Sequence, residues 1–390
     1  MQDRSQIRWR STLLLIGTIV GAGIFGVPAM IGAWGVPVST IAFAAITLVV
    51  LAAHLLYAEA LLANGKIDGR LEQHAAHWLG KPVGMLAGGI QTIQIFGSNL
   101  AYLILGGEFL AVLAQAVGVN IPVIIWQMLF WVLGAVIVCY GLAAVARIEA
   151  HLTWLLIVTI IILIIAFAIR IRIEDISLLG LSLPERVTFE PYGVILFSLL
   201  GITPIPEILE SVGRRRDDAY KVIIRGTVVS AFLTYAFGVF GWLVSSGLIG
   251  RNPSDLVHFL PPVIALVFPL AGFLAIITSF LTTTLDLRNM FHLDYHFSNI
   301  ASWVVSLGVP LVLLFLTPRD FLATIGLIGA VFSSAIAVIV SLMGYQALTA
   351  SLKRRDPWQK RLWSRVVPII VSIILILSGI LWYTVSSPNL

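Results

Sequence analysis

Long uncharged stretches recur along the whole chain, and short segments between them carry most of the charges. A helix needs about 20 mainly apolar residues to cross the hydrocarbon core of a bilayer. Two stretches, 11–58 and the region 82–146, are each long enough for two crossings, divided at AWGVP (33–37) and GVNIP (118–122). The pattern predicts eleven membrane-spanning helices, near residues 12–34, 38–63, 84–116, 122–143, 150–169, 190–210, 223–247, 260–284, 298–317, 321–348 and 366–387.

Composition leads to the same class of protein. Of all residues, 59% are hydrophobic and only 11% are charged, whereas soluble domains carry roughly a quarter charged residues. Such a chain cannot cover a water-facing surface, so we expect an all-α integral membrane protein whose residues 1–390 form a single domain. Cys139 is the only cysteine, which excludes a disulfide and a thiol-ligated metal cluster within one chain.

Basic residues are distributed unevenly between alternate loops. With the N-terminus placed in the cytoplasm, nineteen of the 24 lysine and arginine residues fall on the inner side. Short loops rich in lysine and arginine stay in the cytoplasm, so the chain is expected in the cell membrane with a cytoplasmic N-terminus and an external C-terminus. Contact with anionic membrane lipid accounts for the net charge of +5 without a nucleic acid partner. No obligate protein partner is evident.

Two of the predicted spans contain helix-breaking residues at mid-depth. The first span holds GTIVGAGIFGVP (17–28), and the sixth holds SLLGITPIPEILE (198–210) with Pro204 and Pro206. Breaks five spans apart are typical of transporters built from inverted repeats. We therefore expect one repeat over 12–169, a second over 190–348, and an additional helix over 366–387.

A broken helix leaves backbone N–H and C=O groups without partners, which lipid does not tolerate. Free N–H groups at a helix start attract a carboxylate, and free carbonyls attract an ammonium group or a sodium ion. A molecule with both groups on one carbon is an amino acid. The alternative is that these glycines only permit close helix packing.

The same residues resemble a known superfamily. GTIVGAGIFGVP (17–28) and LLYAEALLANGKIDG (55–69) are similar to the first and second spans of the amino acid–polyamine–organocation superfamily. The segments 201–247 and 277–291, the latter ITSFLTTTLDLRNMF, resemble spans six to eight of the amino acid/auxin and hydroxy/aromatic amino acid permeases within it. The resemblance implies a LeuT-type fold with 5+5 inverted repeats and secondary transport of neutral L-amino acids, aromatic ones included.

The resemblance also implies which residues bind substrate and ion. It places the substrate carboxylate on the backbone of Gly21, Ala22 and Gly23, and the amino group on carbonyls near Leu200, Gly201 and Thr203. The side-chain pocket is expected to draw on Phe25, Asn99, Tyr102, Phe197 and Thr324. A coupling cation would lie between the first and eighth spans, at Gly17, Val20, Thr278, Ser279 and Thr282.

The choice of coupling ion stays open at this point. Thr18 stands where sodium-coupled relatives have asparagine, and the fifth span lacks the lysine of some proton-coupled relatives. Sodium is favoured over protons, with an uncoupled exchanger or facilitator as the alternative. Hydroxyls of membrane helices also bond back to their own backbone, which would leave no ion site.

Acidic residues inside the spans are functional candidates by default. Glu108 is either a proton-coupling group or lies near external water, and Glu59 is expected to pair with an arginine. Glu207 starts the second half of the sixth span, where its carboxylate can cap the free N–H groups and interact favourably with the helix dipole. Asp286 and Arg288, which follow the eighth span, are expected with Glu207 to act as gates.

Other classes of protein fit the sequence less well. A membrane enzyme would need acids, histidines or a metal cluster at one depth, and no such motif is present, so an enzyme is not expected. A divalent-metal transporter would need an acid in the first span, and that span has none. A channel would not need paired breaks. No cofactor is expected beyond a bound sodium ion.

Overall fold

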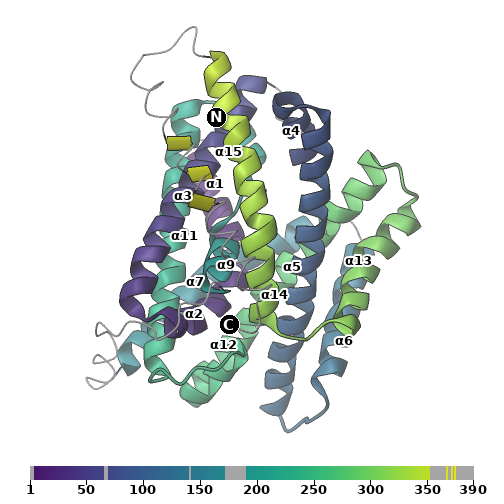
Figure 1. The fold of residues 1–390 in the computed structure, drawn as a ribbon. Helices are drawn as coiled ribbons and strands as arrows, with labels where there is room; N and C mark the ends of the chain where they lie inside the picture. The colour runs from purple at the N-terminus through teal and green to yellow at the C-terminus, as the bar shows by residue number, and fades with distance from the viewer. Residues whose placement is uncertain are drawn as a thin grey trace, which may run out of the picture.

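In the computed structural model of the protein, residues 4–65, 69–139, 142–171 and 190–351 are described, with residues 366–367, 370–371 and 373–374. Throughout these ranges the regular structure is helical (Figure 1). The main helices are α1 (Arg4–Ile19), α2 (Val27–Trp34), α3 (Val36–Asn64), α4 (Leu71–Leu79), α5 (Lys81–Gln115), α6 (Val123–Cys139), α7 (Leu142–Arg170), α9 (Glu190–Leu199), α10 (Ile205–Ser211), α11 (Arg216–Val244), α12 (Pro262–Asn289), α13 (Asn299–Leu316), α14 (Phe321–Leu327) and α15 (Ser334–Ser351).

Four short segments, two 3-10 helices and two π-helical turns, complete the described path. They are 3-10 helices at η1 (Ala22–Gly26) and η3 (Pro253–Phe259), and π-helical turns at η4 (Met290–Asp294) and η5 (Ile328–Ser333). Because η5 joins α14 to α15, the expected span 321–348 is one continuous helical rod. The short helix α4 occupies the loop after the second predicted span.

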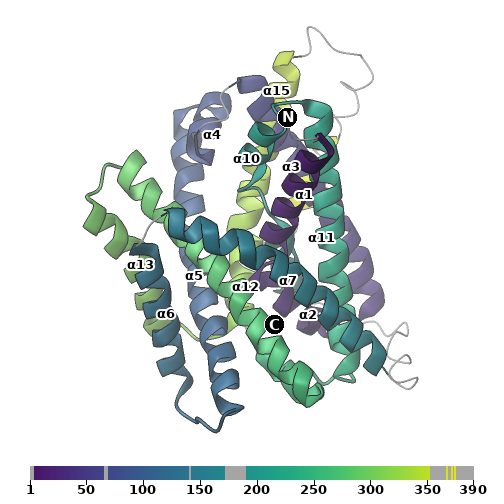
Figure 2. The ribbon, with the colours of Figure 1, turned by 180° about the vertical axis from the view of Figure 1, so that it is seen from behind.

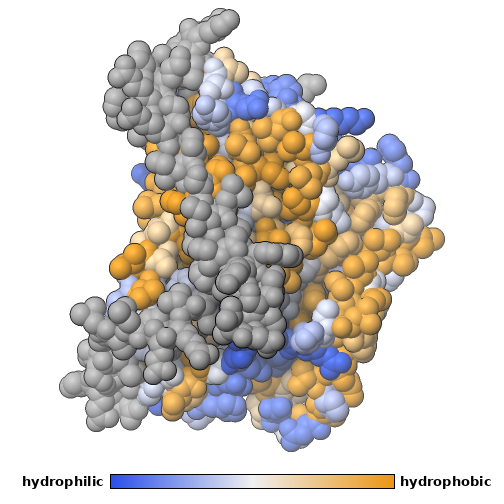
Figure 3. Space-filling view, viewed as in Figure 1, coloured by the Kyte–Doolittle hydropathy of each residue, from blue (hydrophilic) through white to orange (hydrophobic). Residues whose placement is uncertain are grey.

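The outer surface of the bundle is suited to lipid. Within the described residues six helices are long and apolar enough to cross a membrane, or seven if the bent pair of α1 with η1 and α2 is one span. The apolar helices α6 and Trp154–Arg170 of α7 are shorter. Large apolar side chains such as Ile41, Leu48 and Ile300 are more than two-thirds exposed, and Figure 3 shows an apolar band between two polar ends. The chain is a multi-pass membrane protein.

Helix boundaries differ from the predicted ones in a few places. Helix α1 begins at Arg4 rather than near residue 12, and within this added stretch Arg8 pairs with Asp218 of α11 at 2.9 Å. Helix α12 continues to Asn289, past the predicted end at 284. Most of the predicted eleventh span, 366–387, lies outside the described residues, as does most of the segment 170–190.

The two ends of the bundle are named here by their contents. The basic end is the end where α1 begins, and it also carries α4 and the turn before α11; the opposite end carries the turn between α2 and α3 and the segment η3 (Figures 1 and 2). Helix α12 packs along α5 and α7, and α15 packs along α3.

Two hydrophobic clusters fill the interior. One joins α3, α9, α10, α11 and α15, and the other joins η1, α5, α12 and α14. Glycines allow α9 to approach α14 and η5 very closely, since a methyl group on Gly193 would overlap the carbonyl group of Gly326, and one on Gly329 would overlap the carbonyl group of Gly193. The break in the first predicted span lies where the two clusters meet, and the apolar residues around the break in the sixth predicted span belong to the first cluster.

Candidate substrate and ion site

The first predicted span is interrupted at Val20 and Gly21. Helix α1 ends at Ile19, and the rod from Ala22 to Trp34 leaves at an angle of 46°. Gly21 has an extended backbone (φ −111°, ψ −151°) and, as the residue before η1, supplies no side-chain cap. The first N–H groups of a helix have no partner within it, so those of Ala22 and Gly23 are left for another acceptor.

The sixth predicted span is interrupted over Leu200–Pro204. Helix α9 ends at Leu199 and α10 starts at Ile205, with Pro204 preceding it and Pro206 in its first turn. Proline lacks an N–H and disfavours helix in the preceding residue, which accounts for the position of the break. The carbonyl groups between the two helices are correspondingly released from the helical pattern.

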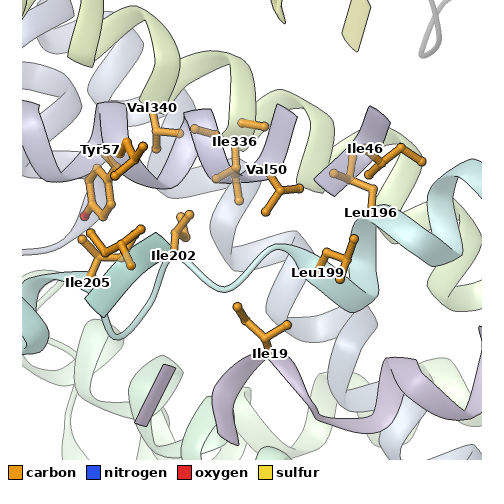
Figure 4. Close-up of a cluster of buried hydrophobic side chains, with 14 of the residues drawn as sticks. Ile19, Ile46, Val50, Tyr57, Leu196, Leu199, Ile202, Ile205, Ile336 and Val340 are labelled. Carbon is orange, nitrogen blue, oxygen red and sulfur yellow. The ribbon is translucent and has the colours of Figure 1, made fainter. Parts of the chain in front are cut away.

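The two breaks lie side by side. A methyl group on Gly23 would stand 2.6 Å from Ser198 Oγ on α9, and one on Gly201 would stand 2.6 Å from Ile19 Cγ1 at the end of α1. Figure 4 shows Ile19 pointing toward the coil between Leu199 and Ile202. The two breaks are therefore in direct contact.

A buried histidine contacts the second break. His54 of α3 is fully buried, and its Nε2 accepts the N–H of Gly201 at 3.1 Å. Its Nδ1 lies 3.0 Å from Thr227 Oγ1 of α11. His54 is not among the residues expected above, although an ionisable side chain inside the uncharged stretch 11–58 is a usable signal.

The expected ion-site residues approach one another where α12 passes the first break. Ser279 Oγ is 3.3 Å from the position that a methyl group on Gly21 would take. Ser279 and Thr278 donate their protons to Ala275 O at 3.0 and 2.9 Å, and Thr282 donates to Thr278 O. These bonds use the hydroxyl protons and leave oxygen lone pairs free. Val20 is fully buried, and Gly17 is half-buried in α1.

The expected pocket side chains differ in their surroundings. Phe25 packs edge-on against Phe109, Phe237 and Phe268, with ring centroids 5.2 to 5.8 Å apart, and these four phenylalanines are named here the aromatic cluster. Tyr102 is 8% exposed and Phe197 is half-buried. Thr324, half-buried on α14, donates its hydroxyl proton to Asp320 O.

Asn99 has its polar atoms committed to a neighbouring helix. Its Nδ2 donates to Thr284 Oγ1 at 3.0 Å, and its Oδ1 accepts from Thr283 Oγ1 at 2.6 Å. Asn99 is fully buried, so these bonds tie α5 to α12 where no water competes.

Solvent-accessible surface extends to both breaks. Thr18 and Thr203 are exposed, and Glu207 in the first turn of α10 is exposed as well. Yet Ile16 and Ile19, which flank Thr18, are at most 5% exposed. Among these residues, the exposed side chains are therefore the polar ones next to the breaks.

Asp286 and Arg288, which were expected to act as gate residues, contact different partners in the structure. Both residues lie in the last turns of α12, and positions two apart on a helix do not face each other. Asp286 pairs with Arg70, which also pairs with Asp294 of η4, while Arg288 donates to Val138 O at 3.3 Å. Arg70 therefore links the segment before α4 to α12 and η4 at the basic end.

At the basic end, an acidic residue of the second predicted span has a basic partner. Glu59 of α3 pairs with Arg216 and accepts a hydrogen bond from Tyr220, both of α11, so the expected arginine pairing is confirmed.

Arg251 forms the corresponding connection at the opposite end. It donates to Glu190 at 2.7 and 3.0 Å and to Asp320 at 2.9 and 3.0 Å. These residues begin α9 and precede α14, so one guanidinium joins the η3 segment to both helices. The hydrogen bonds that Arg251 donates to Glu190, with those to Asp320, raise the pKa of Arg251 further above its ordinary value.

Glu108 lies toward the opposite end of α5. It is half-buried, and its Oε2 is buried with no hydrogen-bond partner among the described residues. Asp255 of η3 and Asp320 are close enough to act on it electrostatically. Glu108 is therefore beneath the η3 segment, away from Ser279 and Gly21 along the bundle.

Solved structures share this arrangement of helices. The chain matches MhsT in complex with L-phenylalanine (TM-score 0.67, 16% identity, 94% of this chain and 98% of that one). It also matches Mhp1, a nucleobase-cation-symport-1 family transporter, in a closed conformation with bromovinylhydantoin bound (TM-score 0.61, 11% identity, 96% and 90%). At these identities the matches establish the fold, which is of the LeuT type.

Curated relatives are transporters as well. Glutamine transporter 2 of Aliivibrio fischeri is 20% identical over 353 residues, 89% of each chain. Tyrosine-specific transport system 1 of Haemophilus influenzae is 23% identical over 359 residues, 85% of this chain and 86% of the relative. These matches confirm the predicted amino acid permease and exclude an enzyme. The model of the tryptophan/tyrosine permease family matches residues 4–385, and the chain belongs to this family.

Proposed function

We propose that this protein is a secondary active transporter that carries neutral L-amino acids, aromatic ones included, by alternating access. The observation that carries the proposal is the contact between the two helix breaks, Gly23 against Ser198 and Gly201 against Ile19. The paired breaks support an inverted-repeat architecture over 12–169 and 190–348, with eleven spans when 366–387 is included.

In this proposal the backbone recognises the substrate. The N–H groups of Ala22 and Gly23 receive the carboxylate, aided by the positive end of the following helix. The carbonyls of Leu200, Gly201 and Thr203 receive the ammonium group. Buried unpaired backbone groups are costly, and one amino acid would satisfy both sets. Gly21 has no side chain, so the carboxylate can approach the backbone.

The proposed substrate range follows from the relatives and the pocket. The relatives are named for tyrosine and glutamine, and the MhsT structure holds L-phenylalanine, all neutral amino acids. Phe25, Tyr102, Phe197 and Thr324 are the proposed wall residues, apolar or uncharged. A charged substrate side chain would find no partner among them.

The ion pairs support one conformation of an alternating-access cycle. Arg251 bridges η3, α9 and α14 at the opposite end, and the aromatic cluster packs beneath it. Meanwhile Thr18 and Thr203 are exposed. We assign this arrangement to a state closed at the opposite end and accessible from the basic end. With a cytoplasmic N-terminus, this state is inward-facing.

For coupling, the proposal favours sodium over protons. Carbonyls of Gly17 and Val20, with the hydroxyls of Thr278 and Ser279 and Thr282 one turn on, supply oxygen ligands suited to a hard cation. No carboxylate is among them, so helix dipoles alone would balance the charge, which suits a monovalent ion.

Uptake into proteoliposomes tests the proposal. Purified protein would be supplied with labelled L-tyrosine, L-tryptophan, L-phenylalanine or L-glutamine under a sodium gradient, a pH gradient, both or neither. Saturable uptake of at least one amino acid, accelerated by the sodium gradient, is the expected result. Absence of uptake and exchange for all four would overturn the proposal.

The same experiment separates the modes of coupling. Acceleration by the pH gradient alone would assign protons as the coupling ion. Equal rates under every gradient would indicate an exchanger or facilitator, and preloading the liposomes with amino acid would then separate those two.

A further inference from the structure

His54 connects three elements of the core. It lies in α3 with its side chain fully buried, and its ring nitrogens contact Gly201 in the second break and Thr227 on α11. Nothing in the proposed substrate and ion site yet includes this residue. Its contact with Gly201, however, is with the segment proposed to bind the substrate amino group.

The two hydrogen-bond partners of His54 determine which ring nitrogen carries the proton. The Gly201 backbone N–H can only donate, so Nε2, 3.1 Å away, must accept it through a lone pair. A neutral imidazole then carries its proton on Nδ1, which donates to Thr227 Oγ1 at 3.0 Å. Both nitrogens are thereby satisfied in one tautomer, and an imidazolium, with two N–H groups, could not accept from Gly201.

Gly201 is held from two sides. His54 accepts its N–H, and on another side Ile19 Cγ1 would stand 2.6 Å from a methyl group on it. The next anchor along the chain is Ile202, which Figure 4 shows among Tyr57, Ile205 and neighbouring apolar side chains. Leu200 and Thr203, by contrast, are partly or largely exposed. The orientation of the carbonyls in this segment thus depends on the His54 bond.

We propose that His54 is a positioning residue for the amino-group subsite: by accepting the Gly201 N–H as the Nδ1-protonated tautomer, it orients the carbonyls of Leu200–Thr203. The inference rests on the proposed function, because it concerns the same subsite. It assigns the ring an indirect role, through the backbone, and no contact with the substrate.

The tautomer is measurable without any transport assay. In 15N-histidine-labelled protein in lipid nanodiscs, the pair of ring resonances missing from the His54→Gln variant belongs to His54. We expect a protonated Nδ1 and an unprotonated Nε2. A protonated Nε2 at neutral pH would overturn the assignment.

Substitutions then test the positioning role. A glutamine side chain can place its carbonyl oxygen near the position of Nε2, whereas asparagine is one methylene shorter and leucine has no acceptor. We expect His54→Gln to bind substrate within about threefold of the unmodified protein. His54→Asn and His54→Leu should bind about tenfold more weakly or worse, with KM raised and maximal rate little changed.

Controls separate a positioning role from general stability. His74→Leu removes another buried histidine, at the basic end on α4, and should leave substrate affinity unchanged. If His54→Leu does not fold, the comparison of His54→Gln with His54→Asn decides. Equal affinity in all folded variants would overturn the inference, while absence of binding in the unmodified protein would overturn the proposed function instead.

Discussion

Gly23 and Ser198 approach so closely that a methyl group on Gly23 would stand 2.6 Å from Ser198 Oγ and 2.8 Å from its Cα. One residue belongs to η1 and the other to α9, separated by 175 positions in sequence. The contact brings the interrupted segments together. It requires glycine at this point because even one added carbon would meet backbone, which cannot rotate away.

Alanine at Gly23 should be far more damaging than alanine at Gly21. At Gly21 the nearest atom to an added methyl group is the flexible Ser279 Oγ at 3.3 Å. Overpacking in a well-packed core costs about 1–3 kcal/mol, so Gly23→Ala should lower thermal stability and weaken substrate binding. Thermal unfolding and equilibrium binding would measure both.

A double variant provides the control. Gly23→Ala combined with Ser198→Gly removes the hydroxyl conflict but leaves the backbone conflict, so it should recover only part of the lost binding. Normal binding by the Gly23→Ala variant would contradict the placement of the two breaks. Valine at either glycine should abolish binding, because its branches would occupy the proposed carboxylate position.

Removal of the α12 hydroxyls tests the ion site. Thr278→Val combined with Ser279→Ala eliminates two proposed sodium ligands while keeping approximate side-chain volume. We expect the sodium concentration for half-maximal uptake to rise roughly tenfold or more. Thr283→Val, whose hydroxyl instead bonds Asn99, is the comparison variant on the same helix. Full sodium stimulation in the double variant would place the ion elsewhere.

Glu108→Gln tests proton coupling. The carboxyl oxygen that has no partner in the described structure lies near η3, so under sodium coupling the variant should transport nearly normally. Under proton coupling it should keep exchange but lose concentrative uptake. Uptake and counterflow measured on the same liposomes separate these results, with Glu207→Gln as a matched acid control near the second break.

Loss of Arg251 should favour opening at the opposite end. Exposed ion pairs contribute about 0–1 kcal/mol each, and Arg251 joins two acids, so Arg251→Ala should raise the opened population roughly several-fold. In a Cys139→Ser background, Ala22→Cys would report opening through reaction with a membrane-impermeant maleimide added at the opposite face. Labelling should accelerate in Arg251→Ala and less in Arg251→Lys. An unchanged labelling rate would exclude a role for Arg251 in keeping the opposite end closed.

Asn99→Leu distinguishes a structural link from a substrate contact. The variant leaves Thr284 buried without its present donor, and an unsatisfied buried polar group costs about 1–3 kcal/mol. We expect lower thermal stability with substrate selectivity retained. A change in the ranking of amino acids by affinity, without loss of stability, would instead place Asn99 in the pocket.

The sequence alone indicated that the protein lies in a membrane, and it predicted the approximate spans and the positions of both breaks. Uncharged stretches reflect the requirement that lipid-facing surface be apolar, and this requirement acts on each segment independently of the rest of the fold. Glycine and proline act equally locally, through their own backbone dihedrals. The interruptions at Gly21 and around Pro204 were therefore readable without knowledge of any partner.

Only the tertiary structure decided which polar groups meet. Asp286 and Arg288 were both expected as gate residues from their place after the eighth span, but on α12 they contact different partners, and Asp286 binds Arg70 from a different segment. His54, Arg251 and the Asn99 bonds likewise depend on residues more than 60 positions away. Hydrogen bonds and ion pairs act over a few ångströms in space, and the packing of helices, rather than their order in the chain, sets those distances.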